Sequence, residues 1–408
     1  MISADVIIVG GGAAGFFTAI NLAEQKPNLK IIILERGKEV LTKVKISGGG
    51  RCNVTHAEFL PKELVEQYPR GKKELLGPFH TFMTGDTVGW FEEKGIPLKT
   101  EDDGRMFPIT DDSQTIIDCF LGEANRLGVE VLTGHSVQEV TFDDEYWHIE
   151  TKEEQFVASS VVVATGSNPK IWKLLKRLGH TIISPVPSLF TFNIQDSRIE
   201  GLAGVSTPAT IRIEGLSNTS LEADGPLLIT HWGMSGPAIL KLSAWGARDL
   251  ATVEYHFSIR VNWLMDVSAA ECVEMLKELK LSLAKKQVAT HPQFDLPKRL
   301  WKRLVTASKI AKEANWAHLS NADISTLAQQ LTNATFQVEG KSTFKEEFVT
   351  AGGVDLVEVD FKTFESKKHR NLYLAGEVLN IDAVTGGFNF QNAWTGGFMV
   401  AKAISDRL

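Results

Sequence analysis

Two short runs near the N-terminus place three spaced glycines and one carboxylate at the ends of two apolar segments. Residues 5–15 read DVIIVGGGAAG, so a β-branched run passes directly into G-x-G-x-x-G at Gly10, Gly12 and Gly15. Gly10 permits a tight turn, Gly12 lets the main chain approach a pyrophosphate, and Gly15 lets the next helix pack closely. Glu35 ends a second apolar run twenty residues later, where a carboxylate can accept hydrogen bonds from ribose hydroxyls. The spacing predicts a dinucleotide-binding unit.

The neighbours of these residues fit the same interpretation. Ala13 and Ala14 open a small-residue helix whose N-terminus would face the phosphates. Arg36 follows directly after Glu35, and we include it among the residues expected to bind the ligand. Because strand, helix, second strand and acid occur in register, we favour binding over a glycine turn that binds nothing.

The elements that must position this unit alternate as in a wound α/β domain. Over the first 185 residues the pattern predicts helices at 72–77, 84–95 and 113–127, a strand at 128–132 and a buried strand at 160–166. The pattern changes at Pro185 and Pro187 to short β segments, with one helix at 235–247. The stretch 268–332 is almost wholly helical, β segments resume at 335–349, a buried strand follows at 372–377 and a helix at 391–408. We therefore predict a discontinuous nucleotide-binding domain (1–187 and 350–408), an inserted β-rich domain (188–262 and 333–349) and a helical domain (263–332).

Composition limits the class of protein. With 408 residues, of which 43% are hydrophobic, the chain can bury large cores in two or three domains. No apolar run approaches membrane-spanning length, and the N-terminus lacks a basic leader, so we expect no membrane partner. Cys52, Cys119 and Cys272 are widely spaced without a C-x-x-C pair. That spacing argues against a disulfide framework and against a metal site, and predicts a cytoplasmic protein.

The charge is unevenly distributed along the chain. The net charge is −7, yet residues 276–312 contain ten Lys/Arg and only two acids. Such asymmetry indicates a polyanionic partner or, alternatively, a solvated helical face. Within it, LPKRLWKRL (296–304) predicts a helix opened by Pro297. The expected buried stripe is Leu300, Leu304, Ala307 and Ala311, and the expected outer residues, which could contact RNA, are Lys298, Arg299, Lys302, Arg303 and Lys309.

Three later segments narrow the dinucleotide to FAD. VVATG (162–166) resembles the second nucleotide-contact motif of flavoproteins with two dinucleotide-binding folds, and LAGE (374–377) resembles their ribityl-binding strand end. TGGFNFQNA (385–393) is a glycine loop that opens the last helix, whose N-terminus could stabilise negative charge on a reduced flavin. The cofactor-binding residues expected from these segments are Ala164, Thr165, Gly166, Gly376, Glu377, Gly387 and Asn389. We expect the FAD to be bound non-covalently.

The segment SGGGRCNVT (47–55) is the most distinctive after the first glycine turn. Three consecutive glycines are costly unless the main chain passes close to something flat or anionic. Arg51, with Lys43 and Lys45 nearby, can supply positive charge to the pyrophosphate or to reduced flavin. Cys52 has no second cysteine close by, which excludes a dithiol mechanism, and it is either a general acid or a packed structural residue. We also expect Ser47, Gly49, Gly50 and Asn53 to contact the cofactor.

Taken together, five motifs resemble a bacterial flavoprotein family, the aminoacetone-oxidase-like or BaiN-like FAD-binding proteins. The motifs are SGGGRCNVT (47–55), GRMFP (104–108), THWGMSGPAIL (230–240), AGGVDLVEVD (351–360) and LAGEVLNIDAVTGGFNFQNAW (374–394). The resemblance implies a two-dinucleotide-binding-type FAD Rossmann domain with an inserted β-barrel-like domain and a helical subdomain. It also implies FAD contacts at Gly10, Gly12, Ala14, Gly15, Glu35, Gly50, Arg51, Cys52, Gly376, Glu377, Gly387 and Asn389.

The resemblance leaves the substrate open, because activities in the family include amine oxidation, reduction of a conjugated steroid C=C bond and formation of dihydrouridine in ribosomal RNA. We expect an FAD-dependent oxidoreductase that moves a hydride between flavin and a C=C or C–N bond, with uracil in ribosomal RNA as one such substrate. The alternatives are a small-amine oxidase that uses O₂ and a non-catalytic FAD-binding protein. No second G-x-G-x-x-G follows a strand, so NAD(P)H is expected only as a transient donor. The catalytic candidates are Cys52 and His231.

Overall fold

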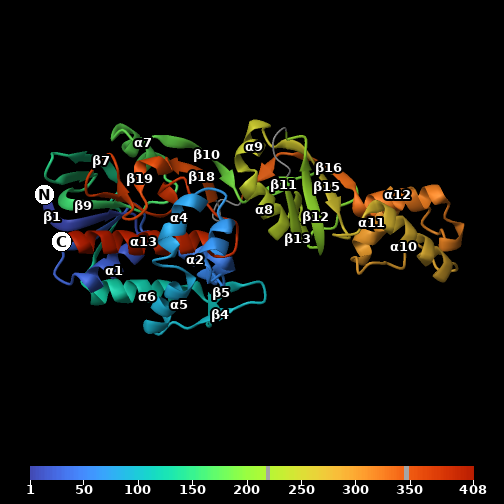
Figure 1. The fold of residues 1–408 in the computed structure, drawn as a ribbon, viewed down its shortest axis with the longest axis horizontal. Coiled ribbons are helices and arrows are strands. Elements are labelled where there is room, and N and C mark those ends of the chain that lie inside the picture. Colours follow the sequence, from blue (N-terminus) through green and yellow to red (C-terminus); the bar gives the residue numbers. More distant parts are fainter. Residues whose placement is uncertain (217–220, 344–348) are drawn as a thin grey trace. The chain divides into compact units, whose positions relative to one another are not determined.

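The computed structural model describes residues 1–216, 221–343 and 349–408, which form two compact units (Figure 1). The first unit comprises Met1–Val186 and Lys345–Leu408, and the second comprises Pro187–Phe344. The first unit therefore contains both ends of the chain. Residues 344–348 of the predicted β segment 335–349 lie outside the described part.

A nine-stranded sheet forms the centre of the first unit. Its parallel strands follow the order β21-β9-β1-β2-β6, with β21 at Leu372–Leu374, β9 at Gln155–Val163, β1 at Ile2–Val9, β2 at Ile31–Glu35 and β6 at Glu130–Thr133. Antiparallel strands extend it: β7 (Val137–Phe142), β8 (Trp147–Thr151), β19 (Val359–Asp360) and β20 (Glu365–Ser366). Strands β2 and β21 and the C-terminal halves of β1 and β9 are buried, which explains their continuous apolar sequences.

Helices and two small sheets complete the first unit. The helices are α1 (Ala13–Gln25), α2 (Thr42–Gly50), α3 (Pro61–Leu64), α4 (Lys72–Phe79), α5 (Thr84–Glu93), α6 (Ser113–Arg126), α7 (Pro169–Arg177) and α13 (Phe388–Arg407). The small sheets pair β3 (Thr55–His56) and β4 (Leu98–Thr100) with β5 (Arg105–Pro108), and β10 (Ile182–Ser188) with β18 (Val349–Val354). The predicted helices at 72–77, 84–95 and 113–127 are confirmed, and the C-terminal helix begins three residues before the predicted Gln391.

The N-terminal and C-terminal helices of the first unit pack side by side along the sheet (Figure 1). Trp394 of α13 is fully buried between them, with its ring centroid 5.3 Å from that of Phe17 and 5.5 Å from that of Phe120. Its indole Nε1 donates a hydrogen bond of 2.9 Å to the carbonyl oxygen of Val54. A C-terminal residue is thus a central part of the core formed by the N-terminal segments.

The second unit contains a seven-stranded sheet in the order β16-β15-β12-β13-β14-β11-β17. The strands are β11 (Thr191–Asn193), β12 (Ser206–Glu214), β13 (Glu222–Ile229), β14 (Gly233–Ser235), β15 (His256–Asn262), β16 (Ala334–Glu339) and β17 (Lys341–Ser342). Gly340 joins the two outer strands of this order. Its N–H donates to Tyr255 O at 3.0 Å and its carbonyl oxygen accepts from Asn193 N at 3.0 Å, so the two ends of the sheet meet at this residue.

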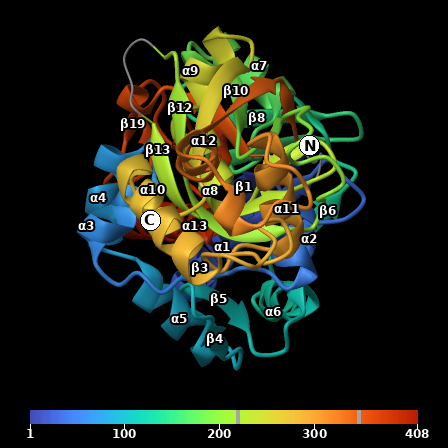
Figure 2. The same cartoon turned by 90° about the vertical axis from the view of Figure 1, so that its right-hand side faces the viewer.

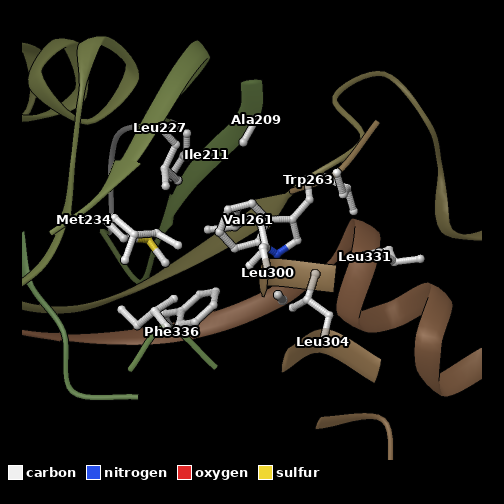
Figure 3. Packing of buried hydrophobic residues seen from close by; sticks show 14 of the residues in the cluster. Ala209, Ile211, Leu227, Met234, Val261, Trp263, Leu300, Leu304, Leu331 and Phe336 are labelled. Carbon is white, nitrogen blue, oxygen red and sulfur yellow. The ribbon is translucent and has the colours of Figure 1, made fainter. Parts of the chain in front are cut away.

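Five helices accompany this sheet: α8 (Pro237–Trp245), α9 (Ala247–Thr252), α10 (Ala269–Ser282), α11 (Lys298–Ala307) and α12 (Asn321–Thr332). Figures 1 and 2 show α10, α11 and α12 grouped together. Figure 3 shows Leu300, Leu304 and Leu331 of these helices near Trp263 and Phe336, which adjoin or belong to the sheet. Helices and sheet therefore share one hydrophobic core.

The predicted stripe of α11 is partly wrong. Leu300 and Leu304 are fully buried, but the helix ends at Ala307, and Ala311 is exposed. The chain leaves the helix through Lys309, whose φ is +61°. Trp301 and Val305 take the remaining buried positions, because the apolar face of a short helix can widen to adjacent residues. Within the part of the chain that the structure describes, no helix is both long and apolar enough to cross a membrane.

We predict that Trp394→Ala lowers the free energy of unfolding of the first unit by about 3–5 kcal/mol, the usual cost of removing a buried aromatic side chain. Urea unfolding followed by tryptophan fluorescence and circular dichroism measures this change. Tyr146→Ala is the matched control, because Tyr146 is an aromatic residue of the same unit, is 41% exposed and should cost much less. Equal losses in the two variants would contradict a central role of α13 in the core.

Candidate functional site

Four parallel strands of the first unit end in register at one edge of the sheet. Val9 is paired with Leu34 and Val163, and Val163 is paired with Leu374. The residues that follow these strands therefore meet at one edge. Ligands of open α/β sheets bind outside this carboxyl edge. The structure brings the predicted segments at 10–15, 35, 164–166 and 376–377 together there.

The first glycine turn is closely packed on one side and open on the other. A Cβ on Gly10 (φ +115°) would lie 2.5 Å from Ala164 O, and a Cβ on Gly15 would lie 2.1 Å from Gly10 O. A Cβ on Gly12, in contrast, would meet no heavy atom within 4 Å. Gly12 immediately precedes α1, whose first turn contains no acidic residue. The main-chain N–H groups at the start of a helix lack intrahelical acceptors, so this open space favours an anion.

Glu35 lies directly beside this turn. Its carboxylate oxygens accept hydrogen bonds from Gly11 N at 2.9 Å and from Gly37 N at 2.7 Å. A carboxylate has about four acceptor positions, so two remain for hydroxyl groups of a ligand. The next residue, Arg36, is exposed. The expected contact between Glu35 and a ribose stays a prediction, and the geometry is compatible with it.

A second carboxylate, that of Glu377, lies at the neighbouring strand end. A Cβ on Gly166 would lie 3.6 Å from Glu377 Oε2, and a Cβ on Gly376 would lie 3.3 Å from Ala14 Cβ. Lys43 of α2 donates to the same Glu377 oxygen at 2.6 Å. The Glu377 side chain is only 16% exposed, so Lys43 balances a charge that is largely removed from solvent. These contacts join three of the predicted motifs.

The glycine segment at the C-terminal end of α2 has two different sides. Gly48, Gly49 and Gly50 all have positive φ angles. A Cβ on Gly48 would lie 2.9 Å from the Phe107 ring, whereas a Cβ on Gly49 or on Gly50 would meet nothing within 4 Å. Gly48 is thus required by packing, and the next two glycines leave a free main-chain surface. A free surface of this kind suits a flat or anionic ligand.

The guanidinium of Arg51 interacts with two carboxylates and an aromatic ring of the protein. Its guanidinium donates to Glu101 at 2.6 Å and lies 3.4 Å from Asp111, with its Cζ 4.0 Å from the centroid of the Phe107 ring. Hydrogen bonding to Glu101 raises the pKa of Arg51, so it is charged at all working pH values. Two carboxylates balance this charge. The predicted role of Arg51 in binding pyrophosphate or reduced flavin stays a prediction.

The two catalytic candidates lie in different surroundings. Cys52 is fully buried, and burial raises the pKa of its thiol to about 12 despite a hydrogen bond with Ser47. The thiol is therefore protonated and covered, which favours the packing role. His231 belongs to the second unit, where it is exposed in the turn between β13 and β14, with its ring centroid 6.0 Å from that of Trp232.

The glycine loop before α13 is held by buried polar groups. A Cβ on Gly387 (φ +96°) would lie 2.5 Å from Thr55 O. With its amide oriented to match its neighbours, Asn53 accepts from Gly387 N at 3.0 Å and donates to Thr55 O at 3.0 Å. Asn389 exchanges two hydrogen bonds with the main chain of Ala383, at 3.0 and 3.2 Å. Both asparagines were predicted to bind the cofactor, and their described contacts shape the loop.

Sequence reasoning missed several residues that support this loop. Tyr68 donates to Phe388 O at 2.6 Å, and Gln391 accepts from Thr55 Oγ1 at 2.6 Å and from Thr87 Oγ1 at 3.0 Å. The guanidinium of Arg70 pairs with Asp382, whose carboxylate is fully buried. These partners are separated by about 300 residues or more in the chain, so no local pattern could have shown them.

His56 was also missed as part of this region. Its ring stacks on that of Phe388 with a centroid distance of 4.5 Å, and its Nε2 bonds to Asp103 O at 3.1 Å. Burial lowers the pKa of His56, so the imidazole is neutral at neutral pH. A neutral ring that donates through Nε2 keeps a lone pair on Nδ1.

Comparison with known proteins agrees with this geometry. Residues 4–403 match the model of the HI0933-like protein Rossmann domain. This chain belongs to the HI0933-like family. It is 29% identical to a ribosomal RNA dihydrouridine synthase of Haemophilus influenzae and 27% identical to a 3-dehydro-bile acid delta(4,6)-reductase of Clostridium scindens, each over 98% of both chains.

A solved structure shows the same fold at much lower identity. The 3-ketosteroid-delta4-(5alpha)-dehydrogenase of Rhodococcus jostii aligns over 99% of this chain and 97% of its own, with a TM-score of 0.51 and 11% identity. The fold is thus an α/β FAD-binding Rossmann type with an additional antiparallel-sheet domain. The HI0933-like chain is a flavin-dependent oxidoreductase.

We predict that Gly12→Val yields a folded protein that purifies without FAD. The new side chain enters space that no protein atom occupies, so it should block the ligand without disturbing the core. Flavin absorbance per chain and the thermal midpoint of the flavin-free protein measure the two effects. Gly122→Val is the matched control, because a Cβ at Gly122 also meets no heavy atom within 4 Å but lies on the exposed part of α6. FAD bound at one per chain in Gly12→Val would contradict the site.

Proposed function

We propose that this HI0933-like protein is an FAD-dependent reductase that adds a hydride and a proton across the C=C bond of a uracil base in RNA, with NAD(P)H as the transient electron donor. The observation that carries the proposal is the near-complete alignment with a ribosomal RNA dihydrouridine synthase, which covers 98% of both chains. The open space at Gly12, Gly49 and Gly50 supports the same conclusion, because it provides main-chain surface for a dinucleotide and a flat ring.

The residues at the carboxyl edge of the sheet fit FAD, which supplies hydride-transfer chemistry when bound. Gly12 and the N-terminus of α1 would hold the pyrophosphate, and Glu35 would accept from a ribose. Glu377, with its partner Lys43, would bind hydroxyl groups of the ribityl chain. The N-terminus of α13, which has no acidic residue in its first turn, would stabilise negative charge on the ring.

Finer features of the fold are part of this proposal. We assign the first unit to the two-dinucleotide-binding type, because strand ends at 164–166 and 376–377 join the first glycine turn. Gly340 connects the two outer strands, β16 and β17, and its hydrogen bonds with Tyr255 and Asn193 support a barrel-like form of the inserted sheet. The helices at 263–332 would then act as a subdomain for binding the nucleic acid.

The basic face of α11 supports an RNA partner. Lys298, Arg299 and Lys302 are exposed, and Arg303 is half-buried. The two arginines also serve the fold, because Arg303 donates to Glu200 O at 2.8 Å and Arg299 lies 3.5 Å from Gly201 O. Lys298 and Lys302 are thus the residues of this face most available to phosphate groups.

A second candidate function is reduction of a conjugated C=C bond in a steroid. The alignment with the bile acid reductase has almost the same identity and coverage as that with the RNA enzyme. A steroid has no phosphate groups, so this function would have no use for the basic face of α11. The same holds for a small-amine oxidase.

We predict that the purified protein, supplied with NADPH and unmodified ribosomal RNA, converts uridine to dihydrouridine. Mass spectrometry of the digested RNA would detect the gain of two hydrogens by a nucleoside. Gly12→Val is the control that lacks the cofactor and should give no product. Conversion of a conjugated steroid ketone without any change in the RNA would favour the second candidate.

We further predict that Lys298→Glu with Lys302→Glu weakens RNA binding and lowers the slope of log Kd against log salt by about 1.4–1.8, since each lost phosphate contact contributes about 0.7–0.9. FAD content should be unchanged. Lys62→Glu with Lys152→Glu, two exposed lysines of the first unit, gives the same change in net charge and is the matched control. Equal binding by wild type and the α11 variant would show that this face is merely solvated.

A further inference from the structure

The first unit, for which we propose flavin binding and which we call the flavin-binding unit, has a basic surface around α7. We propose that this surface, the α7 face, binds the phosphate backbone of RNA and so forms a second contact besides α11; the inference rests on the proposed RNA substrate. The α7 face consists of Lys170, Lys173, Lys176, Arg177, Lys367 and Arg370, all of which are exposed. Figure 1 shows α7 next to β7 at the border of the large sheet.

In helix α7 the buried residues are apolar and the charged residues are exposed. Ile171, Trp172, Leu174 and Leu175 are buried, and every exposed residue from position 170 to the end of the helix is Lys or Arg. Lys170, Lys173 and Arg177 follow the i, i+3, i+7 spacing of one helical face. Seven residues of helix extend roughly 10 Å, so this face can reach more than one phosphate of a strand.

A distant segment adds to the same surface. His369 Nε2 bonds to Leu178 O at 2.6 Å, and the ammonium of Lys368 donates to Gly179 O. These bonds fix residues 367–370 against the C-terminal end of α7. Lys367 and Arg370, on either side of the anchoring pair, therefore lie close to the helix and extend its positive surface.

The positive charge of the α7 face is largely unneutralised. No Asp or Glu occurs between Glu154 and Asp196 in the sequence. Among the described residues, Glu358 lies 2.8 Å from Lys368 and 2.9 Å from His180, and its own side chain is only 10% exposed. Three other cations of the unit, Lys43, Arg51 and Arg126, each have a carboxylate partner. A local positive potential thus persists on a chain of net charge −7.

Helix stability explains only part of this arrangement. Lys368 and His369 bond to carbonyl groups at the end of α7, where cations stabilise a helix. Lys170, however, lies in the first turn of the helix, where the macrodipole disfavours positive charge, and Lys173 lies at its centre, where the macrodipole has little effect. Their presence is better explained by an anionic partner. Lysines contact phosphates as point charges without reading bases, so binding here would be independent of sequence.

The test compares RNA binding by three forms of the FAD-loaded full-length protein. The α7 variant is Lys170→Glu, Lys173→Glu, Lys176→Glu, Arg177→Glu. The matched control reverses four exposed lysines of the same unit that lie outside the α7 face: Lys30→Glu, Lys62→Glu, Lys73→Glu, Lys152→Glu. Both changes alter the net charge equally. The probe is unmodified ribosomal RNA transcribed in vitro, and the measurements are Kd as a function of salt, FAD content and thermal midpoint.

The α7 variant should bind RNA at least about tenfold more weakly and lower the log–log salt slope by about 3, while the control keeps a slope close to that of wild type. Equal losses in both variants, or no loss in either, would overturn the α7 face but leave the proposed substrate intact. Failure of the wild type to bind RNA would overturn both. Binding of the wild type to vesicles of anionic phospholipid, but not to RNA, with loss in the α7 variant, would replace RNA by a membrane surface.

Discussion

The structure depends on one constraint, which is that the carboxyl edge of the large sheet must stay accessible to a ligand directly in front of a helix. Close main-chain contacts fill one side of this space. Gly10 and Gly15 allow the strand, the turn and α1 to touch. Gly12 leaves the remaining side free of protein atoms. An anion placed there would meet unpaired N–H groups and the positive end of α1.

The second half of the site requires that α13 begin at a fixed place. Buried polar groups from separate segments hold its first turn and the preceding loop, among them Asn53, Tyr68 and Thr87. A buried polar group without a partner costs about 1–3 kcal/mol, so such a network is stable in one arrangement and unfavourable in others. Trp394 anchors the same helix in the core. Segments from both ends of the chain therefore contribute to one site.

The sequence predicted the parts of the fold that local patterns determine. The glycine turns, the apolar strands and the helices at 72–77, 84–95 and 113–127 follow from spacing within a few residues. It could not show that Arg51 pairs with Glu101 and Asp111, because those partners lie 50 and 60 residues away. It also placed Ala311 in the buried stripe of α11, since Ser308 and Lys309 give no clear helix stop. It also could not show that Gly340 bonds to Tyr255 and Asn193, because those partners lie 85 and 147 residues away.

Two basic helices, α7 in the flavin-binding unit and α11 in the inserted unit, give the chain positive surfaces that its net charge does not suggest. A polyanionic substrate explains both, and a small amine or a steroid explains neither. The most direct measurement is anaerobic mixing of the fully reduced FAD protein with unmodified ribosomal RNA, with a conjugated steroid ketone and with buffer alone, while flavin absorbance is recorded. We expect RNA to reoxidise the flavin and the steroid to behave like buffer. Reoxidation by the steroid alone, or bleaching of the oxidised flavin by a simple primary amine, would contradict an RNA reductase.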